Sequence, residues 1–186
     1  MVRIDRVTTR GGDGGDTSLG DGTRVRKDEL RIEAIGCVDE TNSTIGVLRF
    51  ASRENAAVDA ILSRIQHDLF DMGADLCVPG DGGDRLRVSD TQTLRLEQET
   101  AAMNEGLPAL RSFVLPAGCA GAAQAHVARA VTRRTERCVV ALAAAETINP
   151  ATIRYLNRLS DLLFVLARHL NAAAEGDVLW TPGINR

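Results

Sequence analysis

The sequence NPATIRYLNRLSDLLFVLARHLN, residues 149–171, carries leucines at the three- and four-residue spacing of one helix face. These leucines are Leu156, Leu159, Leu163, Leu166 and Leu170. Asn149 is a favourable N-cap residue, and Pro150 suits the first helical position because the N–H that it lacks would have no partner there. The stretch therefore predicts a helix whose leucine face fills a core.

Four other segments have the same helical character and are separated by short loops. They cover approximately residues 28–50, 55–77, 91–105 and 121–145. Asp28 is a good N-cap for the first of them. β-Branched alternating runs are few, so we predict an all-α fold, a five-helix up-down bundle of the ferritin-like type.

Composition limits the classes of protein that this chain can be. It has 186 residues, of which 44% are hydrophobic, which is enough for one domain over residues 1–186 with its own core. The net charge of −3 gives no general reason to expect nucleic acid or an anionic membrane as a partner. The longest apolar run, Cys138–Ala145, is far shorter than the roughly 20 residues of a membrane span. Residues 1–6 lack the apolar core of a signal peptide, so we expect a cytoplasmic protein.

The residues that usually bind metals are scattered along the sequence. The cysteines are Cys37, Cys77, Cys119 and Cys138, and the histidines are His67, His126 and His169. No Cys-x-x-Cys pair and no Glu-x-x-His motif occurs. We therefore expect four separate small apolar cysteines, and neither a structural zinc site nor a di-iron centre held by the protein.

A glycine-rich segment, TTRGGDGGDTS at residues 8–18, combines exposed backbone N–H groups with hydroxyls. Such a segment can cradle phosphate. It lacks the Gly-Lys-Ser or Gly-Lys-Thr of a P-loop and follows no predicted strand. A flexible N-terminal arm therefore remains the alternative.

Three arginines share one face of the fourth predicted helix. Arg129, Arg133 and Arg137 follow one another at four-residue intervals. The opposite, core side is predicted to hold Val127, Val131, Cys138 and Leu142. Guanidinium groups bind polyphosphate through paired hydrogen bonds, although a solvated face with ordinary surface ion pairs is also possible.

Two further polar groups lie on helices that are otherwise amphipathic. Asn157 and Asp161 are one turn apart and present an amide and a carboxylate on one face. Residues 38–43, VDETNS, interrupt the first helix, and their acids are either solvated or paired with the arginine face.

Taken in order, these segments resemble the PduO-type ATP:cob(I)alamin adenosyltransferases over nearly the whole chain. The resemblance rests on the glycine-rich start, RIEAIGCVDETNS at 31–43, FVLPAG at 113–118, the arginine helix and NRLSD at 157–161. Ile35, Thr41 and Ala117 depart from the usual tyrosine, leucine and first turn glycine of the family. Alanine at position 117 makes the turn after Phe113 less free to adopt a positive φ than a glycine would.

The resemblance implies a homotrimer with active sites between subunits. Residues 1–26 would form an ATP loop, residues 27–172 the bundle and residues 173–186 a C-terminal tail. The residues implied around ATP are Thr9, Arg10, Gly11, Gly12, Thr17, Ser18, Lys27, Arg133, Arg134, Thr135, Glu136, Arg137 and Asn157. Asp39 would pair with Arg129 across the subunit boundary. Phe113 would lie against the corrin ring and keep its dimethylbenzimidazole tail off cobalt.

The implied reaction is attack of Co(I) of cob(I)alamin on C5′ of ATP, which gives adenosylcobalamin and triphosphate. Arg133 and Arg129, with Mg²⁺, would stabilise the leaving triphosphate. A flavin-dependent reductase and a downstream B12 enzyme are the expected partners. Two alternatives are a corrinoid or nucleotide carrier without catalysis, and a helical assembly protein whose arginines form only salt bridges between subunits.

Overall fold

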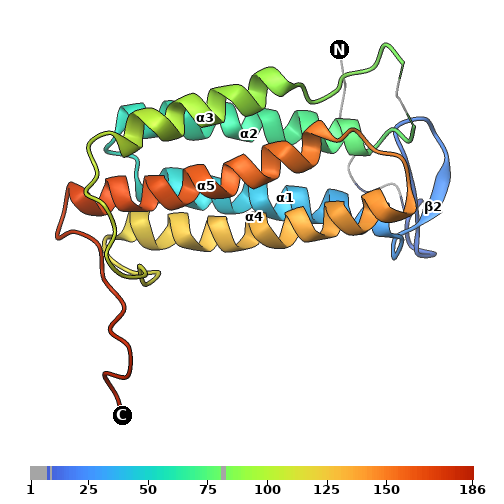
Figure 1. Ribbon diagram of the computed structural model, residues 1–186. Coiled ribbons are helices and arrows are strands. Elements are labelled where there is room, and N and C mark those ends of the chain that lie inside the picture. Colours follow the sequence, from blue (N-terminus) through green and yellow to red (C-terminus); the bar gives the residue numbers. More distant parts are fainter. Residues whose placement is uncertain (1–7, 9, 81–82) are drawn as a thin grey trace.

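A computed structural model of the chain describes residues 8, 10–80 and 83–186. These residues form two short strands followed by five helices (Figure 1). The elements are β1 (Asp16–Ser18), β2 (Arg24–Arg26), α1 (Leu30–Ala51), α2 (Ala56–Leu76), α3 (Asp90–Asn104), α4 (Ala120–Ala145) and α5 (Ala151–Ala172). The five predicted helices are confirmed, and each end lies within two residues of its predicted position.

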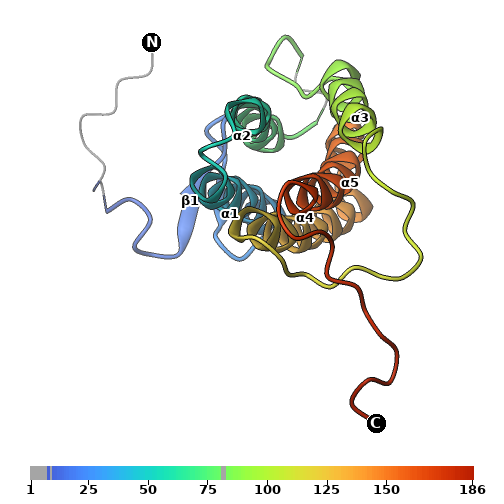
Figure 2. The same cartoon turned by 90° about the vertical axis from the view of Figure 1, so that its left-hand side faces the viewer.

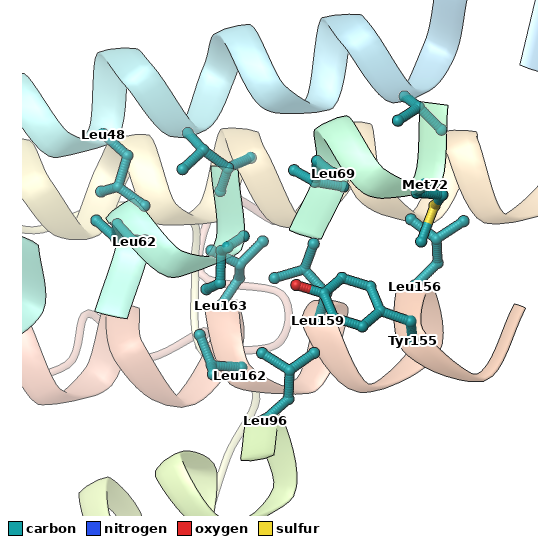
Figure 3. Packing of buried hydrophobic residues seen from close by; sticks show 14 of the residues in the cluster. Leu48, Leu62, Leu69, Met72, Leu96, Tyr155, Leu156, Leu159, Leu162 and Leu163 are labelled. Atoms are coloured by element: carbon teal, nitrogen blue, oxygen red, sulfur yellow. The ribbon is translucent and has the colours of Figure 1, made fainter. Parts of the chain in front are cut away.

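The helices form an elongated bundle in which α4 and α5 pack most closely, and α1 covers α4 (Figures 1 and 2). α2 packs on α1, and α3 packs on α5. The leucine face of α5 points into the centre, where Leu156, Leu159 and Leu163 are fully buried. Figure 3 shows these leucines beside Leu62 and Met72. The sequence-based prediction that α5 supplies the core is therefore confirmed.

A buried carboxylate, Asp75 near the end of α2, joins three segments of the chain. It accepts hydrogen bonds from the backbone N–H of Val88 at 2.8 Å and from Asn149 Nδ2 at 2.7 Å, and it also pairs with Arg87. Asn149 in turn accepts from the backbone N–H of Ala151 at 3.0 Å. The predicted N-cap is wrong by one residue, because α5 begins at Ala151 and Pro150 occupies the N-cap position. Asp75 thus fixes the starts of α3 and α5 against the end of α2.

A second buried carboxylate, Asp68, lies two turns earlier on the same side of α2. It accepts hydrogen bonds from Tyr155 Oη at 2.8 Å and from Gln92 Nε2 at 3.0 Å, and it forms an ion pair with Arg95. Burial, with the neighbouring charge of Asp68, raises the pKa of Tyr155 well above its usual range, so its hydroxyl stays a donor. α2, α3 and α5 are therefore held together by polar contacts as well as by leucines.

The predicted core side of α4 is wrong. Val127 is 49% exposed, Val131 and Cys138 are half-buried, and only Leu142 of the predicted set is fully buried. The residues that α4 buries are mostly small: Gly121, Ala122, Ala125, His126, Ala128, Thr132, Thr135, Val139 and Leu142. Small side chains let neighbouring helices approach closely, and the bulkier valines were therefore a poor guide to the buried face.

Two short strands were not expected in an all-α chain. β1 and β2 pair antiparallel, with Thr17 opposite Val25. The turn between them uses Gly22 at φ +90°, and Asp21 Oδ1 accepts the backbone N–H of Thr23 at 2.9 Å. The hairpin is anchored to the bundle by the backbone N–H of Gly20, which donates to the carbonyl of Cys77 at 2.8 Å. The fold is therefore mostly helical, with an ordered hairpin before the bundle.

The expectation of four separate cysteines is wrong for one pair. Cys37 on α1 and Cys138 on α4 lie with their Sγ atoms 3.4 Å apart. All four cysteines are reduced. The pairing is invisible in the sequence because it depends on which faces of α1 and α4 meet.

No helix within the described part of the chain is long and apolar enough to cross a membrane.

Replacing Asp75 by alanine tests the buried carboxylate. Arg87, Asn149 and the Val88 N–H would lose their buried acceptor, so we expect the free energy of unfolding to fall by about 3 kcal/mol. Urea denaturation at one fixed protein concentration measures this loss. Asp90→Ala is the control, because Asp90 pairs with Arg154 at an exposed position and its loss should cost less than about 1 kcal/mol. Equal losses in the two variants would contradict the role given to Asp75.

Candidate active site

A hollow of about 600 Å³ lies between the middle of the α4–α5 pair and the loop that precedes α4. Its lining residues are Leu110, Ser112, Phe113, Val114, Arg129 and Phe164. The structure thus brings together Phe113 and Arg129, which the sequence placed in two separate motifs. Phe113 is 77% exposed, an unusual degree for a phenyl ring, and it is available to a ligand.

The C-terminal tail, residues 173–186, fixes the backbone on both sides of Phe113. Leu115 N–H donates to the carbonyl of Val178 and Trp180 N–H donates to the carbonyl of Phe113, both at 2.8 Å. The Ser112 hydroxyl donates to the carbonyl of Trp180 at 2.6 Å. The Trp180 and Phe113 rings are 5.9 Å apart, tilted by 60°. The tail and the Phe113 loop therefore form one unit, which sequence reasoning missed because the two segments are far apart in the chain.

The turn after Phe113 tolerates the alanine that replaces a glycine of the family pattern. Ala117 does not adopt a positive φ, whereas Gly118 does, at +110°. A Cβ on Gly118 would lie 2.0 Å from Asn171 Oδ1. That oxygen accepts the backbone N–H of Cys119, and Asn171 Nδ2 donates to the carbonyl of Ala117, each at 3.0 Å. The turn needs glycine at only one of the two positions, so the departure at Ala117 does not disturb Phe113.

The arginine face of α4 has more positive charge than its neighbours neutralise. Neither Arg129 nor Arg133 forms an ion pair with any residue that the structure describes, and Arg129 Nε is buried without a hydrogen-bond partner. Burial, and then the charge of Arg133, lower the pKa of Arg129. Arg137 Nη1 donates only to the backbone carbonyl of Arg133, at 3.0 Å. This face is therefore suited to bind an anion.

The other polar residues predicted on α4 and α5 already have partners. Arg134 forms an exposed ion pair with Glu40, so this acid of residues 38–43 pairs with an arginine of α4 that lies beside the arginine face and not on it. Asn157 Nδ2 donates to Glu136 Oε1 at 2.9 Å. These contacts order the edge of the arginine face.

Thr135 takes a different position from the other predicted residues. It is fully buried, and its hydroxyl lies 2.7 Å from Thr41 Oγ1 and donates to the carbonyl of Cys37 at 2.9 Å. It joins α4 to α1 inside the bundle and does not reach the arginine face. Thr41, which departs from the usual leucine of the family, supplies the matching hydroxyl.

Asp39 lies on α1 at an apolar groove of about 530 Å³ between α1 and α2. The groove is also lined by Ile32, Ile35 and Phe70, and Phe70 is 71% exposed. Asp39 is exposed and makes no ion pair within residues 10–80 and 83–186. Asp39 and Arg129 are therefore not paired within one chain, and each has charge to offer to another molecule.

The N-terminal candidates lie beside α1 and the start of the bundle, on the far side from α4 and α5 (Figure 2). Lys27 Nζ donates to the carbonyl of Gly12 at 2.8 Å, and Arg24 Nη2 donates to the carbonyl of Gly11 at 2.9 Å. Arg10 adopts φ +61°, and Thr17 and Ser18 belong to β1. Thr9 lies outside the described residues.

These N-terminal residues do not join the α4 arginines in one chain. No hydrogen bond or ion pair connects described residues 10–27 with Arg129, Arg133 or Arg137. The residues predicted to bind one nucleotide are therefore divided between two surfaces of the molecule.

Comparison with known proteins identifies the family of this chain. The family model for cobalamin adenosyltransferase matches residues 7–170. A cobalamin adenosyltransferase from Cupriavidus metallidurans is 52% identical over 179 residues, which cover 96% of this chain and 95% of the relative. A corrinoid adenosyltransferase from Mycobacterium tuberculosis is 44% identical and covers 100% of this chain and 97% of its own length.

Solved structures agree with these relatives. A variant of the PduO-type ATP:corrinoid adenosyltransferase from Lactobacillus reuteri, in complex with cobalamin and ATP, superimposes with a TM-score of 0.88 at 34% identity. The match covers 94% of this chain and 99% of that one. With the family model, the close relatives and the shared fold in agreement, this chain belongs to the PduO-type cobalamin adenosyltransferase family.

Proposed function

We propose that this corrinoid adenosyltransferase transfers the 5′-deoxyadenosyl group of ATP to Co(I) of cob(I)alamin in the hollow that contains Phe113 and Arg129. Family membership gives the activity. One observation supports this location: the same hollow is lined by an exposed phenyl ring and by a half-buried guanidinium whose Nε has no partner among the described residues. An apolar ring suits the face of a corrin, and a free cation suits a phosphate chain.

The reaction requires the protein to align cobalt with C5′ and to stabilise the negative charge of the leaving triphosphate. Co(I) attacks C5′, the bond between C5′ and oxygen breaks, and its electron pair leaves with the triphosphate. No proton is transferred, so no general base is needed. Arg129 and Arg133, which lack anionic partners in the described chain, stabilise the charge that develops on the leaving group.

Phe113 acts on the other side of the cobalt. Its ring lies against the lower face of the corrin and keeps the dimethylbenzimidazole tail away, so that cobalamin is bound base-off. Loss of that axial ligand makes Co(I) easier to reach. Trp180 N–H donates to the carbonyl of Phe113 and Leu115 N–H donates to that of Val178, so the backbone that carries the ring is held before the corrin arrives.

The ATP site combines two surfaces that one chain keeps apart. The glycine-rich start would wrap the nucleotide with Arg10, Gly11, Gly12, Thr17, Ser18 and Lys27, and with Thr9. The α4–α5 surface would contribute Arg133, Arg134, Glu136, Arg137 and Asn157. Thr135 supports this surface from within, through its buried contacts to α1.

A homotrimer reconciles these separate surfaces, with each active site between two subunits. Asp39 and Arg129 each lack an ion-pair partner among the described residues, and both lie at open apolar hollows. The pairing of Asp39 from one subunit with Arg129 of the next would satisfy both charges at once.

Mg²⁺ would accompany the triphosphate and neutralise part of its charge. Among described residues, the one cluster of three potential metal-ligating side chains is Glu33, Cys37 and Cys138, which does not belong to the arginine face. Phosphate oxygens and water therefore suit Mg²⁺ better here than a set of protein carboxylates does.

The deciding experiment is an anaerobic assay with purified protein, Mg-ATP and chemically reduced cob(I)alamin. Absorbance follows adenosylcobalamin and chromatography follows triphosphate. We expect the two products in equal amounts. Binding of both substrates without product would favour a carrier, and failure to bind ATP would leave the arginines a structural role.

Arg133→Ala tests the stabilisation of the triphosphate. We expect kcat to fall by roughly 10²–10³-fold while the oligomer stays intact, because the proposed partner of Arg133 is the leaving group. The anaerobic assay and light scattering measure the two quantities. Arg53→Ala is a suitable control, since Arg53 is exposed and pairs with its neighbour Glu54. An Arg133→Ala enzyme with normal turnover would refute this role.

Asp39→Ala and Arg129→Ala test the contact between subunits. Each should weaken both assembly and turnover, and the double variant should be no worse than either single one, because one lost partner already breaks the pair. Dilution-dependent mass and kcat give the two readouts. Glu54→Ala is the control, because Glu54 is exposed and pairs with its neighbour Arg53 away from the proposed site. Additive losses from the two substitutions would show that Asp39 and Arg129 do not interact.

A further inference from the structure

Two thiols and a carboxylate converge between α1 and α4, away from the hollow that contains Phe113. Glu33 and Cys37 are one turn apart on α1, and Cys138 faces them from α4. Cys37 Sγ is 3.4 Å from Cys138 Sγ and 3.6 Å from Glu33 Oε1. One potential ligand atom from each of the three side chains lies within 4.8 Å of the other two.

These separations match the spacing of ligands around one small tetrahedral ion. With zinc–sulfur bonds of about 2.3 Å and a zinc–oxygen bond of about 2.1 Å, tetrahedral angles place two sulfurs about 3.8 Å apart and a sulfur and an oxygen about 3.6 Å apart. The observed Glu33–Cys37 distance of 3.6 Å agrees with this geometry. The two sulfurs, observed 3.4 Å apart, would have to move only slightly away from each other.

We propose that Glu33, Cys37 and Cys138 bind a zinc ion, with water as the fourth ligand. Two thiolates disfavour Mg²⁺ and Ca²⁺, which prefer oxygen, and the carboxylate disfavours Cu⁺, which prefers sulfur. A disulfide would need the sulfurs at about 2.0 Å and an oxidant, and it would leave Glu33 without a role. The inference does not depend on the site proposed for ATP and corrinoid.

The surroundings are favourable for a charged site that water can reach. Cys37 is buried, Cys138 is half-buried and Glu33 is exposed, so the carboxylate side is the entry path and the place for a water ligand. A dianionic thiolate pair, a carboxylate and Zn²⁺ together carry one net negative charge. Arg134, which also pairs with Glu40, contributes positive charge from α4.

Zinc must displace protons when it binds. Burial, and then the hydrogen bond and charge of Cys138, raise the pKa of Cys37 to about 12, although Arg134 opposes the shift. The groups that face the pair are Glu33 on α1 and Arg134 on α4. Zinc binding therefore has to release the proton of the Cys37 thiol.

A zinc ion here would clamp α1 to α4 beside the arginine face. Cys138 follows Arg137 directly, and Thr135 already joins the two helices through the carbonyl of Cys37. The metal would thus stabilise the register in which α4 presents Arg133 and Arg137, without contacting either substrate.

Competition with a zinc-loaded chromophoric chelator tests the proposal on the reduced, full-length protein. We expect one Zn²⁺ per chain with a Kd below about 1 μM at pH 7.5. Co²⁺ as a substitute should give thiolate-to-metal absorption. Cys138→Ser should weaken Zn²⁺ binding more than about 100-fold, and Glu33→Gln, an exposed substitution, roughly 10-fold.

Cys77→Ser and Cys119→Ser are the matched controls, because neither thiol belongs to the cluster, and both should bind Zn²⁺ as the unmodified chain does. Binding of less than one equivalent by the unmodified chain would overturn the proposal. Unchanged affinity in both Cys138→Ser and Glu33→Gln would do the same. A protein that has lost two titratable thiols and no longer binds Zn²⁺, even when it is freshly reduced, would contain a disulfide instead of the metal site.

Discussion

The close contact of α4 with α1 and α5 through small side chains determines how the rest of the molecule is arranged. Ala122, Ala125 and Ala128 are completely buried, and so is the Thr135 hydroxyl that bonds to Thr41. Because alanine and threonine occupy little space, α4 lies deep in the bundle and turns its arginines outward. The same rotation places Cys138 against Cys37 and Arg129 beside Phe113. Larger residues on this face would move every one of these groups.

The polar residues divide into those whose partners lie in the chain and those without any. Asp68 and Asp75 are buried and satisfied by several donors each, so they stabilise the fold. Arg129 Nε is buried without a partner in the described chain, although burial of a charge is costly unless it is paired. A buried cationic group that lines a hollow and has no partner in the described chain is therefore better evidence for a bound ligand or a neighbouring subunit than positive charge alone.

The sequence predicted the helices well because each carries its own periodic signal. The leucines of α5 illustrate this, since their spacing is a local pattern. Contacts between distant segments were not predictable in the same way. The pairing of Trp180 with the Phe113 backbone and the approach of Cys37 to Cys138 depend on how helices rotate and where the tail runs. The candidate site residues were proposed from their motifs, whereas their division between two surfaces became visible only in three dimensions.

Because the glycine-rich start and the α4 arginines lie on separate surfaces, assembly of subunits can control the reaction. If ATP needs the glycine-rich start of one subunit and the arginines of another, an isolated chain can hold only part of the nucleotide. Cob(I)alamin is a powerful nucleophile, so a site completed only by assembly restricts where an electrophilic carbon is presented to it. Phe113 differs from the arginines in this respect, because its loop and the C-terminal tail are held within one chain. In the proposed trimer, folding would prepare the corrin-facing side of the site, and association the phosphate-facing side.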